Sequence, residues 1–214
     1  MYSSKPLLIC LACLIPNAGT AAELVVRDVR AALLVRSSDF EFDLDSPTFD
    51  RSGDDSFDSG TGFELGARYS FTPTGGSWGL VVGGDLTADW YSYDGGDGLA
   101  MYGLRAAGGG GWAVADDWTL VSELGVGYAF SEMTLPATSA AAEFTADGTS
   151  LFYDARLSCL YRVHERWSIH AHVGYMIASH DLSGDGVDLS IDQDGVWAGI
   201  GFTWLFSNKP TRLE

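Results

Sequence analysis

Serine and histidine side chains stand close together at two places in the chain, and such pairs can carry out acyl transfer. Ser168, His170 and His172 occupy alternate positions, so a β-strand would project all three to the same side. A hydroxyl beside an imidazole base is the arrangement found in hydrolases and acyltransferases. The second group is the contiguous stretch HDLS at 180–183, which brings no obvious group to stabilise an oxyanion.

A further set of residues carries charge at alternate positions of otherwise apolar or small-residue stretches. Charges enclosed in a narrow interior must pair, because an unpaired buried charge has a large desolvation cost. Five positive and five negative residues predict a closed ion-pair network, whereas an ion-selective pore would present mostly one sign. The ten residues are Arg30, Arg36, Arg68, Arg105, Arg156, Glu64, Asp85, Asp89, Glu123 and Asp154.

Eight stretches of strict alternation must position these side chains. A period of two is typical of a β-strand with two different faces. The prolines at 47, 73, 136 and 210 all fall outside the stretches, as strand hydrogen bonding requires. The predicted strands are about Val25–Ser37, Gly62–Phe71, Trp78–Tyr91, Leu99–Val114, Trp118–Phe130, Leu151–Arg162, Trp167–Ala178 and Gly195–Phe206.

The connections between these strands alternate between short and long. The short ones are TPTGG at 72–76, ADD at 115–117 and VHER at 163–166. The long ones are rich in Asp, Ser and Gly, and we expect them to be large acidic loops: Glu41–Gly60, Ser92–Gly98, Ser131–Ser150 and His180–Asp194. Eight strands joined only by hairpins form a meander, which closes naturally into an up-and-down barrel.

The acidic loops also raise the question of metal binding. The stretch SGDGVDLSI at 183–191 partly matches a calcium-binding nonapeptide repeat, but it lacks the first glycine and occurs once. Such sites are built between stacked copies, so a solvated loop is the better interpretation. We therefore expect no cofactor and no dedicated metal site, beyond weakly bound divalent cations at the loops.

The composition of the two strand faces indicates which one contacts water. The less apolar faces carry Gly, Ala, Ser, Thr and a few charges, which suits a crowded lumen better than a soluble surface. The opposite faces are continuously apolar. Aromatic residues gather at both strand ends, with Trp118 and Trp167 near the short turns and Trp90 and Phe130 near the long connections. Aromatic rings flanking an apolar band are typical of a barrel in a bilayer. We predict an all-β fold, an eight-stranded antiparallel up-and-down transmembrane β-barrel.

With these features the chain resembles the small eight-stranded outer-membrane barrels of Gram-negative bacteria, typified by OmpX and the OmpA transmembrane domain. The resemblance covers nearly all of the mature chain, and its most specific part is the last strand, GIGFTWLF. It implies that this strand presents its aromatic end to the barrel-assembly machinery. The residues that carry this role are Gly199, Gly201, Phe202, Trp204 and Phe206.

The N-terminus is predicted to be a secretory signal. Residues 1–22 combine Lys5, an apolar core too short to span a bilayer, and small residues that suit cleavage after Ala22. Residues 23–214 then form the outer-membrane β-barrel domain. Cys159 remains as the single cysteine of the mature chain, so a monomer has no internal disulfide. The net charge of −17, without a basic patch, excludes nucleic-acid binding of the usual kind.

These observations predict a non-enzymatic protein of the bacterial outer membrane with a lumen closed by ion pairs. Its acidic extracellular loops would serve surface interaction, or the barrel would contribute to envelope integrity. The expected partners are outer-membrane lipid, lipopolysaccharide and the barrel-assembly machinery, the extracellular partner is unknown, and we expect a monomer.

Two alternatives stay open, a lipid-A-modifying enzyme and a narrow channel. The enzyme is disfavoured because Ser168 and His170 fall near the short turns, on the periplasmic side of the predicted topology. The channel is disfavoured because eight strands leave an interior only just wide enough for side chains.

Overall fold

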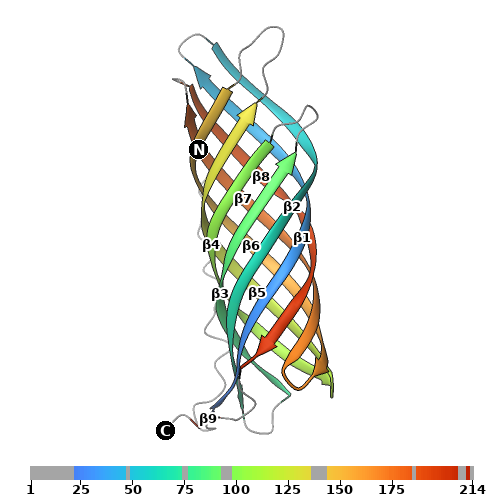
Figure 1. Cartoon of the computed structure of the whole chain (residues 1–214). Coiled ribbons are helices and arrows are strands. Elements are labelled where there is room, and N and C mark those ends of the chain that lie inside the picture. Colours follow the sequence, from blue (N-terminus) through green and yellow to red (C-terminus); the bar gives the residue numbers. More distant parts are fainter. Residues whose placement is uncertain are drawn as a thin grey trace.

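Eight long antiparallel strands form the wall of the molecule (Figure 1). The computed structural model describes residues 22–46, 49–73, 77–92, 98–135, 144–184, 187–206 and 211–212. Each long strand forms an antiparallel pair with the next one in the sequence. The strands are β1 (Ala22–Ser46), β2 (Phe49–Pro73), β3 (Trp78–Ser92), β4 (Gly98–Ala115), β5 (Trp118–Leu135), β6 (Phe144–His164), β7 (Trp167–Gly184) and β8 (Val187–Leu205).

The sheet closes into a ring because β1 pairs with both β2 and β8. Arg30, for example, lies opposite Gly66 of β2 and opposite Thr203 of β8. This confirms the prediction of an all-β, eight-stranded antiparallel up-and-down barrel. A short additional strand that the alternation pattern did not predict, β9 (Thr211–Arg212), pairs with Glu23 and Leu24 at the start of β1.

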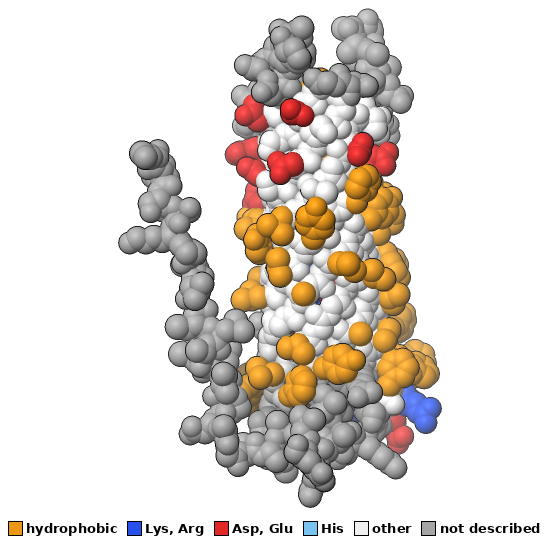
Figure 2. Space-filling view, turned by 90° about the vertical axis from the view of Figure 1, so that its left-hand side faces the viewer, with side chains coloured by type: hydrophobic (Ala, Val, Ile, Leu, Met, Phe, Trp, Pro, Cys, Tyr) orange, Lys and Arg blue, Asp and Glu red, His pale blue; other side chains and the backbone are white. Residues whose placement is uncertain are grey.

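Each strand turns one face outward and the other into the barrel, and β8 shows this most clearly. Val196 and Ile200 are 60% and 61% exposed, whereas Trp197 and Thr203 are 5% and 0% exposed. Large exposed hydrophobic side chains occur on all eight strands, and they form a belt on the face seen in Figure 2. A continuous apolar surface of this extent marks contact with lipid rather than with water.

The strands continue well beyond this belt, which corrects the prediction of long acidic loops. β1 and β2 contain 25 residues each, whereas about 9–11 residues suffice to cross a bilayer. Most of Glu41–Gly60 is the upper half of the β1–β2 hairpin, and most of His180–Asp194 belongs to β7 and β8. Much of Ser131–Ser150 likewise belongs to β5 and β6. The acidic composition suggested loops. A paired strand beyond the membrane can nevertheless carry acidic side chains, because water solvates the carboxylates while the neighbouring strand satisfies the backbone hydrogen bonds.

The predicted signal lies almost entirely outside the described residues, which begin at Ala22. Its cleavage site and the domain boundary at residue 22 therefore stay predictions. Among the residues that the structure describes, no helix is both long enough and apolar enough to cross a membrane.

Candidate functional site

The ten charged residues predicted to face inward all lie inside the barrel, and each one forms an ion pair there. They are buried because they share the strand face that points away from lipid. The partners come from different strands, so the pairs cross the interior rather than follow one strand. The ion pairs among them are Arg36–Asp89, Arg68–Asp85, Arg68–Glu123, Arg105–Asp85, Arg105–Asp154, Arg156–Glu64 and Arg30–Glu123.

Asp85 is the centre of this network. Its carboxylate accepts hydrogen bonds from Nη1 and Nη2 of Arg68 at 2.7 and 2.8 Å, and from Nη1 of Arg105 at 2.7 Å. Arg68 also donates to Glu123 at 2.5 Å, and Arg105 donates to both oxygens of Asp154 at 2.6 Å. The chain of five charges joins β2, β3, β4, β5 and β6 across the lumen. Bidentate guanidinium–carboxylate pairs fix the geometry of both groups, so this chain of charges connects the five strands rigidly across the lumen.

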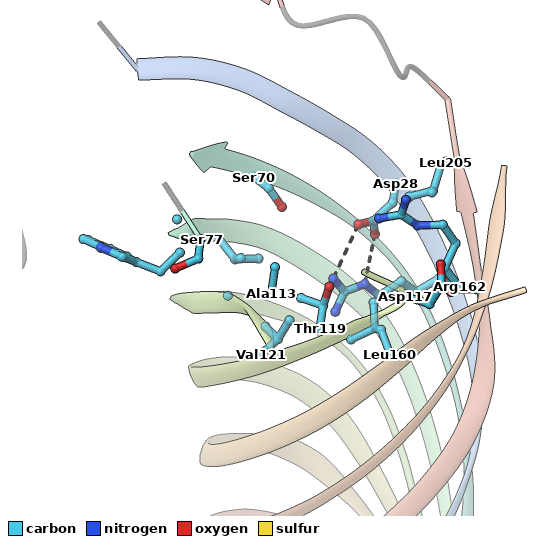
Figure 3. Close-up of a pocket in the computed structure, with 16 residues that line it drawn as sticks. Asp28, Ser70, Ser77, Ala113, Asp117, Thr119, Val121, Leu160, Arg162 and Leu205 are labelled. Carbon is cyan, nitrogen blue, oxygen red and sulfur yellow. Dashed lines mark hydrogen bonds and ion pairs between the residues drawn. The ribbon is translucent and has the colours of Figure 1, made fainter. Parts of the chain in front are cut away.

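Asp28 is a buried charged residue that the sequence analysis missed. It lies two residues before Arg30 on the same strand face, and this spacing was the signal that could have identified it. Its carboxylate accepts hydrogen bonds from Nε of Arg30 at 2.9 Å and from Nη2 at 3.4 Å. The pair lines a cavity of about 290 Å³ at the short-turn end of the barrel, to which Arg162 and Ser168 also contribute (Figure 3).

Nearer the long hairpins the interior is largely apolar, which the sequence analysis also did not predict. Trp197 lies where the two regions meet, with the guanidinium carbons of Arg156 and Arg36 at 4.7 and 5.4 Å from its ring centre. Apolar side chains that fill a narrow tube exclude hydrated ions. We call this cluster the outer plug; its members are Ala32, Leu34, Phe40, Tyr91, Leu99, Met101, Ala129, Ala146, Phe152, Met176, Ala178, Leu182, Leu189, Ile191 and Trp197.

Gly127 and Gly174 make room for two aromatic side chains of the outer plug. A Cβ atom at Gly127 would lie 2.0 Å from the ring of Phe152, and one at Gly174 would lie 2.5 Å from the ring of Trp197. Each ring therefore occupies the space above a neighbouring glycine. The small residues of the inward faces are part of how a narrow barrel accommodates aromatic rings.

The first serine–histidine group, Ser168, His170 and His172, does not form a catalytic arrangement. Ser168, His170 and His172 all face inward, as their spacing predicted. His170 Nδ1 forms its hydrogen bond with Oγ1 of Thr203 at 3.0 Å rather than with Ser168. The ring centres of His170 and His172 lie 5.2 Å apart with the ring planes inclined by 38°, so the two imidazoles are neighbours along the inward face of β7.

The second group, the stretch HDLS at 180–183, is divided between the inner and the outer face of the barrel wall. Asp181 and Ser183 are exposed on the outer side of β7, whereas His180 is fully buried inside. His180 forms hydrogen bonds with Ser150 of β6 and Gln193 of β8. Among the hydrogen bonds formed by the described residues, no histidine bridges a serine and a carboxylate.

Exposed acidic residues lie on the outer wall beyond the apolar belt, and several of them appear above it in Figure 2. Asp39 lies opposite Asp194, and Glu41 lies opposite Asp192, so two like-charge pairs follow each other along β1 and β8. Directly opposed like charges destabilise a strand pair unless something neutralises them. We call this set the acidic collar; its members are Asp39, Glu41, Asp43, Glu132, Asp147, Asp181, Asp188, Asp192 and Asp194.

The calcium-like stretch at 183–191 forms the end of β7 and the start of β8, with residues 185–186 outside the described part. Within that described part, no group of three or more His, Cys, Asp or Glu side chains could hold a metal ion.

The last strand has the two faces that its sequence predicted. Phe202, Trp204 and Phe206 are exposed in the apolar belt, whereas Gly199 and Gly201 face inward. Ile169 of β7 and Ala31 of β1 lie on either side of Phe202, so the strand closes the ring. Its recognition by the assembly machinery stays a prediction.

No family model matches this chain, and no curated protein does. Solved structures do match. OprG from Pseudomonas aeruginosa is 16% identical with a TM-score of 0.50, over 87% of this chain and 97% of that one. Ail of Yersinia pestis is 17% identical with a TM-score of 0.44, over 86% and 100% of the two chains. The outer-membrane protease OmpT from Escherichia coli is 9% identical with a TM-score of 0.45, over 85% and 97%. The likeness to OprG confirms the predicted resemblance at the level of fold.

Proposed function

We propose that this chain, which has the fold of the bacterial outer-membrane β-barrels, is a non-enzymatic outer-membrane protein that keeps its lumen closed and acts through its outer surface. The observation that carries the proposal is the double closure of the interior. Charge pairs fill the lumen nearer the short turns, and the outer plug fills it nearer the long hairpins. A fold by itself does not decide function, whereas the side chains that fill a lumen decide whether ions can cross it.

The charge pairs support a closed lumen rather than a selective channel. Each of the five inward arginines has a carboxylate partner, so none offers a free charge to a passing ion. Arg68 is 0% exposed, which leaves no room for a hydrated ion beside it. An ion that crossed would have to separate several bidentate pairs and then enter the outer plug, and both steps are costly.

The β1–β2 hairpin supports a role in surface contact. Residues 49–57 of β2 pair with β1, but pairing of β2 with β3 begins only at Ser59. Among the described residues, the upper part of β2 thus pairs on one side only. A free strand edge can accept an extended segment by strand addition. The sequence of this part, FDRSGDDSFD, contains four aspartates and one arginine, so it would favour a basic segment and repel a second copy of itself.

The acidic collar supports a role for divalent cations in contact with lipopolysaccharide. Its carboxylates would repel the phosphates of that lipid directly, whereas a cation shared between carboxylate and phosphate would attract both. Binding of lipopolysaccharide to the barrel is then expected to need Mg²⁺ or Ca²⁺ and to fall when a chelator is added. Assembly by the barrel-assembly machinery and a monomeric state complete the proposal.

Conductance in planar bilayers tests the closed lumen. We expect no steady single channels from the refolded protein. Replacing both Trp197 and Phe152 by alanine removes two of the four aromatic rings of the outer plug, and brief openings are then expected. Ile200→Ala, which shortens a lipid-facing side chain, is the matched control and is expected to stay silent. Large, steady channels from the unmodified protein would instead support the narrow-channel alternative.

Peptide binding tests the outer surface. A shortened variant replaces residues 41–54 by Asn-Gly, a two-residue turn that suits the pairing of Phe40 with Asp55, and so removes residues 49–54 of the edge that pairs on one side only. The probe is an extended peptide of alternating lysine and threonine, and the control peptide carries glutamate in place of lysine. We expect the basic peptide to bind the unmodified barrel in liposomes and to lose affinity for the shortened one. Equal binding to both barrels would contradict a role for the hairpin.

A further inference from the structure

A row of hydrogen bonds crosses five neighbouring strands inside the outer half of the barrel. Ser131 of β5 lies 2.5 Å from Ser150 of β6, whose Oγ lies 2.6 Å from Nδ1 of His180 in β7. Nε2 of His180 lies 2.9 Å from Oε1 of Gln193 in β8, and Nε2 of Gln193 donates to Oγ of Ser38 in β1 at 3.0 Å. All five side chains are buried. We call this row the polar latch.

The polar latch defines the protonation state of His180. Because the Gln193 amide donates to Ser38, its oxygen faces His180 and can only accept a hydrogen bond. Nε2 of His180 must therefore carry the hydrogen, and Nδ1 is left as an acceptor for the Ser150 hydroxyl. Ser131 can then donate to Ser150, so every hydrogen bond of the row is satisfied in one direction by a neutral imidazole.

Among the side chains that the structure describes, none near His180 is a partner for a positive charge. Its next inward neighbours along β7 are Ala178 and Leu182, both members of the outer plug. The inward groups that face it are Ser131 from β5, Ser150 from β6, Gln193 from β8, Ser38 from β1 and, further round, Tyr91 from β3. None of these is a carboxylate.

The charged groups at this level lie on the outer side of the wall or are already paired. Asp181 and Asp192 neighbour the latch along β7 and β8, but their side chains are exposed. On the other strands the outward acids at this level are Asp39, Glu132, Asp147 and Asp194. Arg36, the next inward residue down β1, is held by Asp89. Within the described part of the chain, the interior around the latch thus holds no free counter-charge.

We infer that the polar latch is a proton-sensitive closure of the outer half of the barrel, with His180 as its titrating group. A proton on Nδ1 converts the acceptor of the Ser150 hydrogen bond into a donor and places a positive charge inside the outer plug. The two serine hydroxyls must reverse, and the charge gains no carboxylate. Acid therefore favours an arrangement in which strands β5 to β8 loosen above the apolar belt and admit water, while the lower ion pairs hold.

The position and burial of His180 agree with this role. It lies three residues beyond Ile177, an exposed apolar residue of the belt on β7, and its outward neighbours are polar, so it is outside the membrane-crossing part. Burial lowers the pKa of His180 to about 4, although the Gln193 hydrogen bond and the charges of Asp192 and Asp181 act to raise it. Neutral His180 is thus the stable form at neutral pH.

Hydrogen exchange between pH 7 and pH 4, corrected for the intrinsic rate, tests the inference on the refolded protein in detergent micelles. We expect peptides around Ser131 and Ser150 to lose protection as the pH falls, while peptides around Asp85 keep theirs. His180→Gln retains an N–H donor but cannot titrate, so its outer half should stay protected. His164→Gln changes a histidine of the β6–β7 turn and should behave like the unmodified protein. Equal loss of protection in His180→Gln and in the unmodified protein would overturn the inference, as would no loss in either.

A direct titration keeps the inference testable if His180→Gln does not fold. The imidazole of His180 is followed by NMR in the unmodified protein and in Ser150→Ala. Removing the Ser150 hydroxyl takes away a donor that stabilises the neutral ring, so the midpoint should move to higher pH. A midpoint for the unmodified protein at or above about 6.5, the ordinary value for histidine, would refute a buried latch, and so would a midpoint that Ser150→Ala leaves unchanged.

Discussion

The pair formed by Glu64 and Arg156 offers the sharpest measure of what the lumen charges contribute to stability. Glu64 is 2% exposed and Arg156 is 5% exposed. Nη1 of Arg156 donates to Oε1 of Glu64 at 2.7 Å, and Nη2 donates to Oε2. Glu64 is the carboxylate with which Arg156 forms its ion pair in the described part of the chain. Glu64→Gln keeps the shape but replaces one of the two acceptor oxygens with an NH2 donor, and it leaves the guanidinium without a counter-charge.

The expected cost follows from that burial. Breaking one side of a buried ion pair destabilises a protein by about 3–5 kcal/mol, because the remaining charge stays desolvated. Arg156→Met leaves the Glu64 carboxylate in the same position and should cost a similar amount. In the double variant both charges are gone, and the penalty should be smaller than that of either single change. Glu132→Gln removes an exposed acid of the acidic collar and should change stability by less than about 0.5 kcal/mol.

Reversible unfolding of the protein in lipid vesicles by guanidinium chloride measures all four variants under one condition. The double-mutant cycle then separates the coupling between the two charges from the effects of each substitution. Single variants that lose less than about 1 kcal/mol would show that water enters the site. Penalties that simply add in the double variant would show that the two residues act independently, and the reasoning about closure by charge pairing would fail.

Three further outcomes are expected. Leu124→Arg places a charge in the lipid-facing belt and should cost about 2–4 kcal/mol near the bilayer midplane, as measured by the same unfolding assay; a change below 1 kcal/mol would place this residue outside the membrane. Protonation of His180 should lower stability as the pH falls from about 6.5 toward 4, because the folded pKa of about 4 lies below the unfolded one. The unfolded chain then binds the proton more readily, and the total loss is about 3 kcal/mol, absent in His180→Gln. Protease added to whole cells should cut the outer β1–β2 hairpin and spare the short turn at Asp116, so cleavage at that turn in intact cells would invert the topology.

The sequence by itself determined the architecture and the two faces of every strand. The sequence shows strict alternation, prolines confined to the connections, and apolar faces with almost no lysine. Together these features predict a barrel with lipid outside and charges inside. The ten inward charges were identified for the same reason: in a strand the side of a residue depends only on whether its position is odd or even along the chain.

Only the tertiary structure showed which inward side chains contact each other across the barrel. Parity places Arg68 and Glu123 inside, but strand tilt and register determine that they meet, and no local pattern along the sequence encodes either. The same holds for His180, which appeared to belong with Asp181 and Ser183 yet bonds to Ser150 and Gln193 on neighbouring strands. The outer plug was not predicted, although alternation places Leu99, Met101 and Leu182 on inward faces. Only the closed ring shows that these side chains meet, and that the interior at this height holds apolar and neutral polar groups rather than ion pairs.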